Sequence, residues 1–360
     1  MIDVVVIGGG QAGLAAGYFL RRTGLEFVIL DAARRPGGSW QHMWPSLRLF
    51  SPAEHSPLPG WPMPRQPGTE YPGREHVVDY LSQYEQRYAL PVHRPADVVG
   101  VHNGSDHLEV HTDGEVWHAR SVISATGTWQ SPYMPSYAGQ TEFTGCQLHT
   151  VSYRAAEEFH GQHVVIVGGG NSAAQILAEV SIVAETTWCT RRPPRFMPDD
   201  VDGRVLFDVA TRRRTGTASH RAGAAESDGV AGLGDIVMTP DVLAARDRGV
   251  LHAQPMFDHI TPHGVAWADG TERRADAIIW CTGFRFALGH LHPLNLRRRG
   301  GRIPTEGTRS IQQPRLHLLG YGDWTGFASA TIIGAGRAAK SAVAEISARP
   351  RVGHHRSGQR

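Results

Sequence analysis

The amino-terminal stretch Ile2-Asp3-Val4-Val5-Val6-Ile7-Gly8-Gly9-Gly10-Gln11-Ala12-Gly13 decides the fold. Its first part, Ile2–Ile7, is a short run rich in β-branched residues, which is typical of a buried parallel strand. A glycine turn follows, then an apolar helical stretch, Leu14–Leu20, and a second strand, Phe27–Leu30. Strand, glycine turn, helix and strand in this order predict a βαβ unit that binds a dinucleotide.

Each glycine of this turn has a physical reason. Gly8 permits a sharp exit from the strand, Gly10 lets the backbone approach a pyrophosphate, and Gly13 lets helix and strand pack closely. The helix amino terminus then offers free N–H groups and a partial positive charge to the phosphates. Asp31 stands 23 residues after Gly8, where a carboxylate can accept hydrogen bonds from a ribose hydroxyl. We expect the first dinucleotide to contact Gly8, Gly10, Gln11, Gly13 and Asp31.

The same unit occurs a second time. The strand Val164–Val167 leads into Gly168-Gly169-Gly170-Asn171-Ser172-Ala173, an apolar helix over Ala174–Val180 and a strand over Thr186–Thr190. The glycine pattern is G-x-G-x-x-A, an accepted variant. One such pattern is weak evidence, whereas two copies with the same flanking elements are strong. The expected contacts of the second dinucleotide are Gly168, Gly170, Asn171, Ser172 and Ala173.

The second unit differs from the first after its second strand. Arg191 lies 23 residues after Gly168, the offset at which Asp31 follows Gly8, and Arg192 comes next. A carboxylate there would repel a 2′-phosphate, while a guanidinium can bind one with two hydrogen bonds. We therefore predict that Arg191 and Arg192 select NADPH over NADH.

A further repeat closes each unit. Ser121–Ala125 precedes Thr126-Gly127, and Ala277–Cys281 precedes Thr282-Gly283. Each follows a polar stretch with β patterning, so a hairpin feeding a sharp turn is expected at the end of both domains. Gly127 is therefore a further candidate for cofactor contact.

From Ile2 to Ala348 the chain resembles the flavoproteins with two dinucleotide-binding domains, which hold FAD first and the nicotinamide cofactor second. Leu316–Leu319 with Gly320-Tyr321-Gly322-Asp323 is similar to that superfamily's second FAD segment. The resemblance implies that Asp323 contacts FAD and that a helix over Ala328–Ala339 faces the flavin. The fold class is then α/β, with two Rossmann-like domains and the NADPH domain inserted into the FAD domain. The expected divisions are an FAD domain (1–142), a linker (143–160), an NADPH domain (161–286), the rest of the FAD domain (287–348) and a disordered tail (349–360).

The predicted linker carries a more specific pattern. Phe143, Gly145, His149 and Tyr153 match the F-x-G-x-x-x-H-x-x-x-(W/Y) signature of the class B flavin monooxygenases. The Baeyer–Villiger branch has Trp where Tyr153 stands, followed by Pro or Asp rather than Arg154. His149 is a catalytic candidate, although organising the hinge or touching NADP+ is the favoured role, and no other catalytic side chain is assigned.

Two more segments resemble parts of these enzymes. One is Pro36-Gly37-Gly38-Ser39-Trp40, whose glycines would let the chain pass close to the flavin ring. Gly38, Ser39 and Trp40 are the expected contacts, with Trp40 along the cofactor. Phe50 stands where flavin-containing monooxygenases carry an Asn that helps hold NADP+; Ser51 is a possible polar substitute. The stretch Ser46–Pro64 is most similar to flavin monooxygenases of bacterial arsenic-resistance operons (the ArsO-like group).

The resemblance implies an NADPH- and oxygen-dependent flavoprotein monooxygenase. It would oxygenate a soft nucleophilic heteroatom (N, S or As) of a small molecule through a flavin C4a-(hydro)peroxide. The alternatives are an NADPH oxidase or reductase without oxygen insertion, a Baeyer–Villiger monooxygenase, and a non-catalytic flavin sensor. A disulfide reductase is disfavoured, because Cys146, Cys189 and Cys281 form no Cys-x-x-Cys pair.

Composition narrows the other possibilities. A formal charge of +2 over 360 residues gives no reason to expect nucleic acid or a membrane surface as a partner. No signal peptide or membrane span is expected, and few cysteines suit a reducing cytoplasm. No His, Cys, Asp or Glu group has metal-ligand spacing, and the cysteines are interpreted as structural. The polar segment 198–234 is either an active-site lid or a surface loop.

Overall fold

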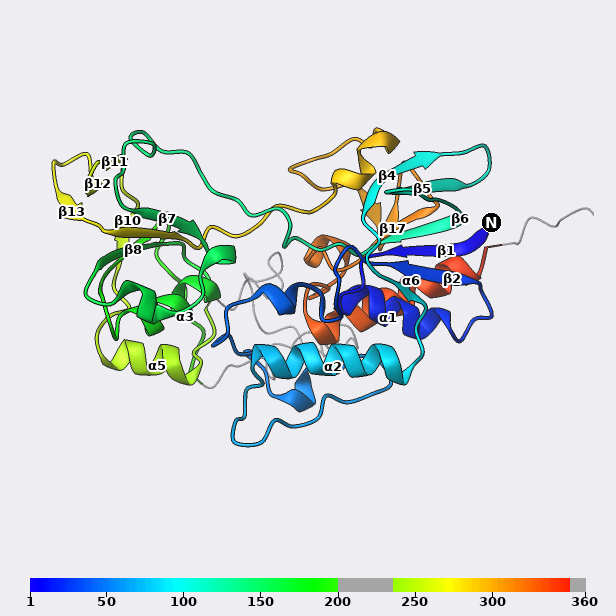
Figure 1. Cartoon of the computed structure of the whole chain (residues 1–360), viewed down its shortest axis with the longest axis horizontal. Coiled ribbons are helices and arrows are strands. Elements are labelled where there is room, and N and C mark those ends of the chain that lie inside the picture. Colours follow the sequence, from blue (N-terminus) through cyan, green and yellow to red (C-terminus); the bar gives the residue numbers. More distant parts are fainter. Residues whose placement is uncertain (200–235, 350–360) are drawn as a thin grey trace, which may run out of the picture.

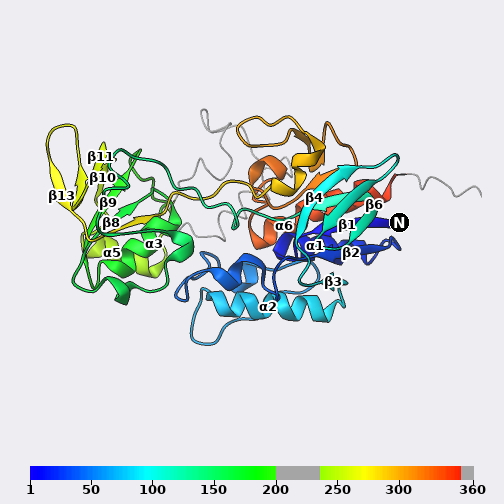
Figure 2. The same cartoon turned by 45° about the horizontal axis from the view of Figure 1, so that its top comes forward.

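The computed structural model describes residues 1–199 and 236–349, which form two bodies (Figure 1). The chain crosses to the second body after β6 (Val116–Ser124) and returns after β14 (Ala277–Trp280), and both crossings run side by side in Figures 1 and 2. The body that holds the amino terminus also holds the last helix, so the second body is an insertion. This confirms the predicted α/β architecture.

The first body is built on a nine-stranded sheet, with β1 (Ile2–Ile7) between β2 and β6. Both neighbours run parallel to β1, and β17 from the end of the chain pairs in parallel with β6. The other strands are β2 (Phe27–Leu30), β3 (Val92–His93), β4 (Val98–Asn103), β5 (Leu108–Thr112), β15 (Thr305–Glu306), β16 (Arg309–Ser310) and β17 (Leu316–Leu318). The carboxyl ends of β1, β2, β6 and β17 therefore meet at one edge, where such sheets bind ligands.

The second body repeats this plan on five strands. β8 (His163–Val167) lies between β9 (Glu185–Thr190) and β14, all parallel, and a small antiparallel sheet packs near them. The remaining strands are β7 (Cys146–His149), β10 (Ala253–Pro255), β11 (His259–Thr261), β12 (Gly264–Ala266) and β13 (Glu272–Arg274).

Helices cover one face of each main sheet. In Figure 1 they lie below the strands in both bodies. They are α1 (Gln11–Leu20), α2 (Arg74–Arg87) and α6 (Ile332–Ser347) in the first body, and α3 (Asn171–Val180) and α5 (Pro240–Asp247) in the second. Apolar side chains of β1 and β8 are completely buried between the layers, so each body has its own core. No helix of residues 1–199 and 236–349 combines the length and apolarity that crossing a membrane requires.

Two expected elements differ in the structure. The segment 143–160 contributes β7, which pairs in parallel with β14 as an edge strand, so it is part of the second sheet rather than a free linker. The last helix begins at Ile332 instead of Ala328, because Ala328 has a positive φ and Thr331 caps the helix by accepting from the Gly334 amide. The predicted lid and tail lie outside the described residues, from 200 and 350 respectively.

Candidate active site

A cavity of about 740 Å³ opens at the carboxyl edge of the first sheet. Its walls come from the first glycine turn, the ends of β2 and β6, the segment 38–43 and the turn after β17. Eight of the residues expected to contact a cofactor line it: Gly8, Gly10, Gln11, Asp31, Gly38, Ser39, Trp40 and Gly127. Segments more than 300 residues apart in sequence thus form one site.

The glycines of the first turn leave room that no other residue would leave. Gly8 has φ +106°, and an added Cβ would lie 2.6 Å from the Ala125 carbonyl oxygen. A Cβ on Gly38 would lie 2.8 Å from the Gly10 Cα. No side chain caps α1 and its first turn holds no acid, so its amide groups face the cavity as an anion site. Gly13 lies behind the turn, where a Cβ would overlap the Gly8 carbonyl oxygen.

Gln11 joins three walls of the cavity. Its Oε1 accepts a hydrogen bond from the Trp40 indole N–H at 3.0 Å, and its Nε2 donates to the Ala330 carbonyl at 2.7 Å. The side chain therefore holds the Trp40 segment and the approach to α6 against the first turn. This positioning role adds to the backbone contact expected from the motif.

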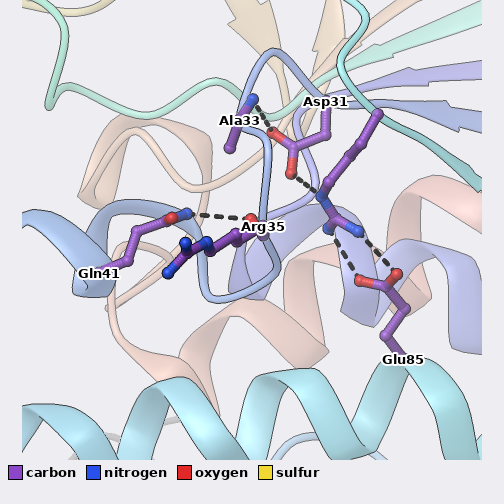
Figure 3. Close-up of polar contacts among 6 residues, drawn as sticks. Asp31, Ala33, Arg35, Gln41 and Glu85 are labelled. Atoms are coloured by element: carbon purple, nitrogen blue, oxygen red, sulfur yellow. Dashed lines mark hydrogen bonds and ion pairs between the residues drawn. The ribbon is translucent and has the colours of Figure 1, made fainter.

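Asp31 is held by a network that the sequence did not reveal. Arg94 Nε donates to Asp31 Oδ2 at 2.6 Å, and its two terminal nitrogens donate to Glu85 at 2.7 and 2.8 Å. In Figure 3 the Asp31 and Glu85 carboxylates face each other across this guanidinium. Asp31 Oδ1 accepts only a long bond of 3.4 Å from the Ala33 amide among the hydrogen bonds described. That oxygen retains capacity for a ribose hydroxyl.

Tyr321 anchors the middle of the cavity. Its hydroxyl lies 2.5 Å from Ser124 Oγ and 2.8 Å from Thr126 Oγ1, and the Thr126 amide donates to it. His290 Nε2 contacts the same Ser124 hydroxyl at 3.0 Å. The hydrogen bonds fix the carboxyl end of β6 against the returning chain. No functional role is predicted from the sequence for any of these four residues.

The end of the cavity nearest the second body is aromatic. Trp129 stacks on Phe284 with ring centroids 5.5 Å apart and on His42 at 6.0 Å. These rings sit where the two crossings pair, because the Tyr133 amide donates to the Gly283 carbonyl and the Arg285 amide to that of Ser131. Trp129 and Phe284 were not predicted, since nothing in their local sequence indicates that they meet.

Asp323 does not line the cavity. It is exposed, and its Oδ1 accepts from the Ala328 amide at 2.9 Å, which shapes the turn before α6. The neighbours Gly320, Tyr321 and Gly322 line the cavity instead. The segment given by the resemblance therefore borders the cavity through these three residues, and a contact between Asp323 and FAD stays a prediction.

The second glycine turn has the expected backbone but a more open setting. Gly168 has φ +140°, and its carbonyl accepts from the Trp188 indole at 2.6 Å. Asn171 Oδ1 accepts from the Val237 amide, which joins the turn to the segment before α5. Gly170 and Ser172 are partly exposed at the start of α3, while Ala173 is buried. None of these residues lines the 740 Å³ cavity.

Arg191 and Arg192 follow β9 directly and are both exposed. Since β9 pairs with β8 up to Val167↔Cys189, the two arginines emerge beside the second glycine turn. Thr190 lies 3.8 Å from the position of a Cβ on Gly169. The guanidinium groups of Arg191 and Arg192 are therefore within reach of a ligand on the second glycine turn.

The histidine of the linker pattern has both ring nitrogens engaged. His149 Nδ1 accepts from the Val151 amide at 3.3 Å, so Nε2 is the nitrogen that donates to the Gly283 carbonyl at 3.0 Å. Burial lowers the pKa of His149, which keeps it neutral. Its ring meets Phe284 edge-on at 5.2 Å. This arrangement favours a role in positioning the crossings over proton transfer.

The aromatic residue of the same pattern connects the two bodies. Tyr153 donates to Glu179 Oε2 at 2.9 Å, and Ser46 donates to Glu179 Oε1 at 2.7 Å. Tyr153 also packs edge-on against Trp44. Glu179 on α3 therefore joins the segment 44–46 of the first body to the end of the linker pattern.

Buried histidines give the protein a defined response to acid. Burial lowers the pKa of His290 to about 4 and that of His317 to about 3. Below about pH 6.5 the unfolded chain takes up protons that the folded chain refuses, so stability falls by up to about 1.4 kcal/mol per pH unit for each group. We expect the melting temperature to drop between pH 7 and pH 5, and to drop less in His290→Gln. The exposed His252→Gln should follow the parent protein; identical slopes in all three would contradict this origin.

Comparison with known proteins identifies the class. Residues 5–222 match the family model described as pyridine nucleotide-disulphide oxidoreductase. A flavin-containing monooxygenase from Stenotrophomonas maltophilia is 54% identical, with a TM-score of 0.87, over 96% of this chain and 98% of that one. An uncharacterized CzcO-like oxidoreductase of Geobacillus kaustophilus is 29% identical over 89% of this chain and 91% of its own. Indole-3-pyruvate monooxygenase YUCCA1 of Oryza sativa subsp. japonica is 26% identical over 86% and 82%.

The fold and site thus define an FAD-dependent oxidoreductase with two dinucleotide-binding domains. Within the pyridine nucleotide-disulphide oxidoreductase family, the chain belongs to the class B flavin-dependent monooxygenases. The three cysteines are free, and no two of them form the Cys-x-x-Cys pair that is typical of a dithiol redox site. Burial raises the pKa of Cys189 and of Cys281 to about 12, so both are neutral thiols.

Proposed function

We propose that this protein uses NADPH and O₂ to oxygenate a soft nucleophilic heteroatom (N, S or As) of a small molecule. The observation that carries the proposal is the 740 Å³ cavity, which starts at a phosphate-binding turn and ends at an aromatic wall between the two bodies. Ligand-binding clefts commonly have volumes of about 300–1,000 Å³, so a cavity of this size can hold a cofactor. The likeness to a flavin-containing monooxygenase at 54% identity supports the oxygen chemistry.

The first body has separate groups for the successive parts of FAD. The amides at the start of α1 would hold the pyrophosphate, Asp31 the ribose, and Gly38 the close approach of the chain. Trp40, fixed by Gln11, would lie along the cofactor. When bound, FAD supplies the hydride acceptance and oxygen activation that no side chain here can perform.

The chain's own contribution at the far end is orientation and dryness. Trp129 and Phe284 cover the space with apolar surface, and His290 is neutral and bonded to Ser124. The charged Asp31 lies beside the glycine turn, bound to Arg94. A reactive end lined mainly by aromatic surface suits a substrate that is itself nucleophilic, such as an amine, sulfide or trivalent arsenic.

The second body is proposed to bind NADPH. Gly168, Gly170, Asn171, Ser172 and Ala173 would form its pyrophosphate turn, with Arg191 and Arg192 on the 2′-phosphate. His149 would set the path of the two crossings that separate this site from the flavin. The link to arsenic stays a prediction from resemblance.

One observation favours an NADPH oxidase as a second candidate. Phe50 replaces the amide side chain that flavin-containing monooxygenases use near NADP+, and Ser51 does not substitute for it. Ser51 is 4% exposed, and its hydroxyl pairs with Ser56 at 2.8 Å. Weaker retention of the nicotinamide would release oxygen as hydrogen peroxide.

One assay separates the two candidates. Purified flavin-loaded protein is given NADPH in air-saturated buffer with a panel of sulfides, tertiary amines and trivalent arsenicals. NADPH consumption, hydrogen peroxide and oxygenated product are measured together. We expect at least one compound to accelerate NADPH consumption. With that compound, oxygenated product should form in place of most of the hydrogen peroxide. Complete recovery of electrons as peroxide with every compound would leave the oxidase as the function, and lactone or ester from a ketone control would indicate the Baeyer–Villiger reaction.

A further inference from the structure

A second polar cluster lies outside the cavity, on the antiparallel ladder β4–β5–β6. Glu109 on β5 stands opposite His102 on β4 and opposite His118 on β6. His111 lies two residues after Glu109 on β5, which places both side chains on the same face, and the ring of His107, just before β5, contacts His118 on that face. Four imidazoles and a carboxylate therefore share one surface, and none of them lines the 740 Å³ cavity.

Three of these side chains converge on one point. The ligand atoms of His107, Glu109 and His118 all lie within 4.8 Å of one another. His118 Nδ1 is 2.9 Å from His107 Nε2, which in turn is 3.6 Å from Glu109 Oε1. A zinc ion bound at about 2.0–2.1 Å to each of two ligand atoms separates them by about 3–3.5 Å. The 3.6 Å separation is close to that range, the 2.9 Å contact would have to lengthen slightly, and all three ligand atoms lie within 4.8 Å of one another.

The surrounding groups orient these ligands as metal sites require. Asp106 Oδ1 lies 3.0 Å from His107 Nδ1, which places the ring proton on Nδ1 and leaves the Nε2 lone pair facing Glu109 and His118. His111 Nε2 lies 3.3 Å from the other oxygen of Glu109.

The turn before β5 permits this arrangement. A Cβ on Gly104 would lie 2.6 Å from His107 Nε2, the proposed ligand atom. Any other residue at 104 would force the imidazole of His107 to shift from its place beside Glu109 and His118. This close approach provides a variant that perturbs the cluster without removing a ligand.

We propose that His107, Glu109 and His118 bind one divalent transition-metal ion, with Zn²⁺ as the best match and water completing the coordination. Two imidazole nitrogens and one carboxylate suit zinc, whereas calcium and magnesium prefer oxygen ligands alone. The ion joins β5 to β6 far along the ladder from the glycine turn. Its expected effect is therefore on stability of the first body, with no part in oxygen activation.

The test uses the full flavin-loaded chain, freed of any affinity tag and stripped with a chelator. Zn²⁺ alone is titrated against a chromophoric competitor at pH 7.5, and the melting temperature is recorded with and without zinc. We expect each chain to bind one zinc ion with high affinity and the melting temperature to rise when zinc is present. His107→Ala/His118→Ala should weaken binding by about a hundredfold and abolish the rise, and Gly104→Ala should weaken it by about tenfold.

A matched double variant, His252→Ala/His259→Ala, removes two exposed histidines of the second body and should bind zinc like the parent protein. Flavin content reports that each variant is folded. Lowering the pH to 5.5 should weaken binding to the parent protein, because protonated imidazoles do not ligate. Equal zinc affinity in the parent protein and in His107→Ala/His118→Ala would overturn the proposal, as would an unchanged melting temperature in the parent protein.

Discussion

Gly13→Ala is expected to yield a colourless protein with less than about a tenth of the parent's flavin. Gly13 lies in the first turn of α1, and an added Cβ would overlap the carbonyl oxygen of Gly8. The backbone fixes the position of the Cβ, and the carbonyl oxygen is itself a backbone atom, so no rotamer change relieves the overlap. Either α1 moves away from β1 or the turn opens, and both displace the amides that would hold the pyrophosphate. Overpacking of this kind costs about 1–3 kcal/mol or more in stability.

The measurement is the ratio of flavin to protein absorbance after purification, together with the melting temperature. Gly73→Ala is the control, because Gly73 lies at the start of another helix of the first body, α2, has φ −81°, and has no neighbour closer than 3.8 Å to an added Cβ. Glycine is preferred over alanine at an N-cap, so this replacement costs roughly 1 kcal/mol of stability without creating an overlap at the first turn. Full flavin content in Gly13→Ala would mean that the first turn is not the FAD site.

The elements with strong local signals were predicted closely. β1 and β2 have the expected bounds, and β8, α3 and β9 differ from the prediction by one to three residues at their starts. These elements combine a clear apolar pattern with a glycine turn. The predicted start of α6 was wrong. The stretch before Ile332 is rich in small residues that suit a helix, but Asp323 and Thr331 fix a turn there through side-chain hydrogen bonds.

The segment 143–160 shows a second limit. Its sequence predicts a linker because β7 is only four residues long and alternates weakly. The strand exists because β14 presents a free parallel edge, from Ala277↔Cys146 to Trp280↔His149. Pairing with a strand 131 residues later in the chain leaves no local pattern in the sequence. Propensity is overridden here by tertiary context.

The candidate site shows the same difference between local sequence patterns and contacts that form only in the folded chain. The backbone cradle and Asp31 were predictable, because turn geometry restricts the residue type. Arg94, Tyr321, Trp129 and Phe284 were not, since each meets its partner only through the crossings or the sheet. The proposed metal ligands show no metal-ligand spacing along the chain, because His118 comes from the strand after Glu109. Strand alternation in His107-x-Glu109-x-His111 is the signal that could have indicated them.

Replacing both Arg191 and Arg192 by glutamine should raise the Michaelis constant for NADPH by about tenfold to a hundredfold. A charge-assisted hydrogen bond to a phosphate contributes about 1.5–3 kcal/mol, and two guanidinium groups beside the second turn can supply several. NADH lacks the 2′-phosphate, so its Michaelis constant should change by less than about threefold. Initial rates of NADPH and NADH oxidation measure both values on the same preparation.

The control must remove equal charge from the same body, because a general loss of positive potential also slows binding of an anion. Arg273 and Arg274 on β13 provide this, since they are adjacent, exposed and distant in the fold from the glycine turn. Arg274 pairs with Asp276 on the surface, a contact whose loss changes stability little. Arg273→Gln/Arg274→Gln should keep the preference for NADPH over NADH. If the Arg191 and Arg192 variant weakened both nucleotides equally, the arginines would act through overall charge, and selection of NADPH would have to lie elsewhere on the second body.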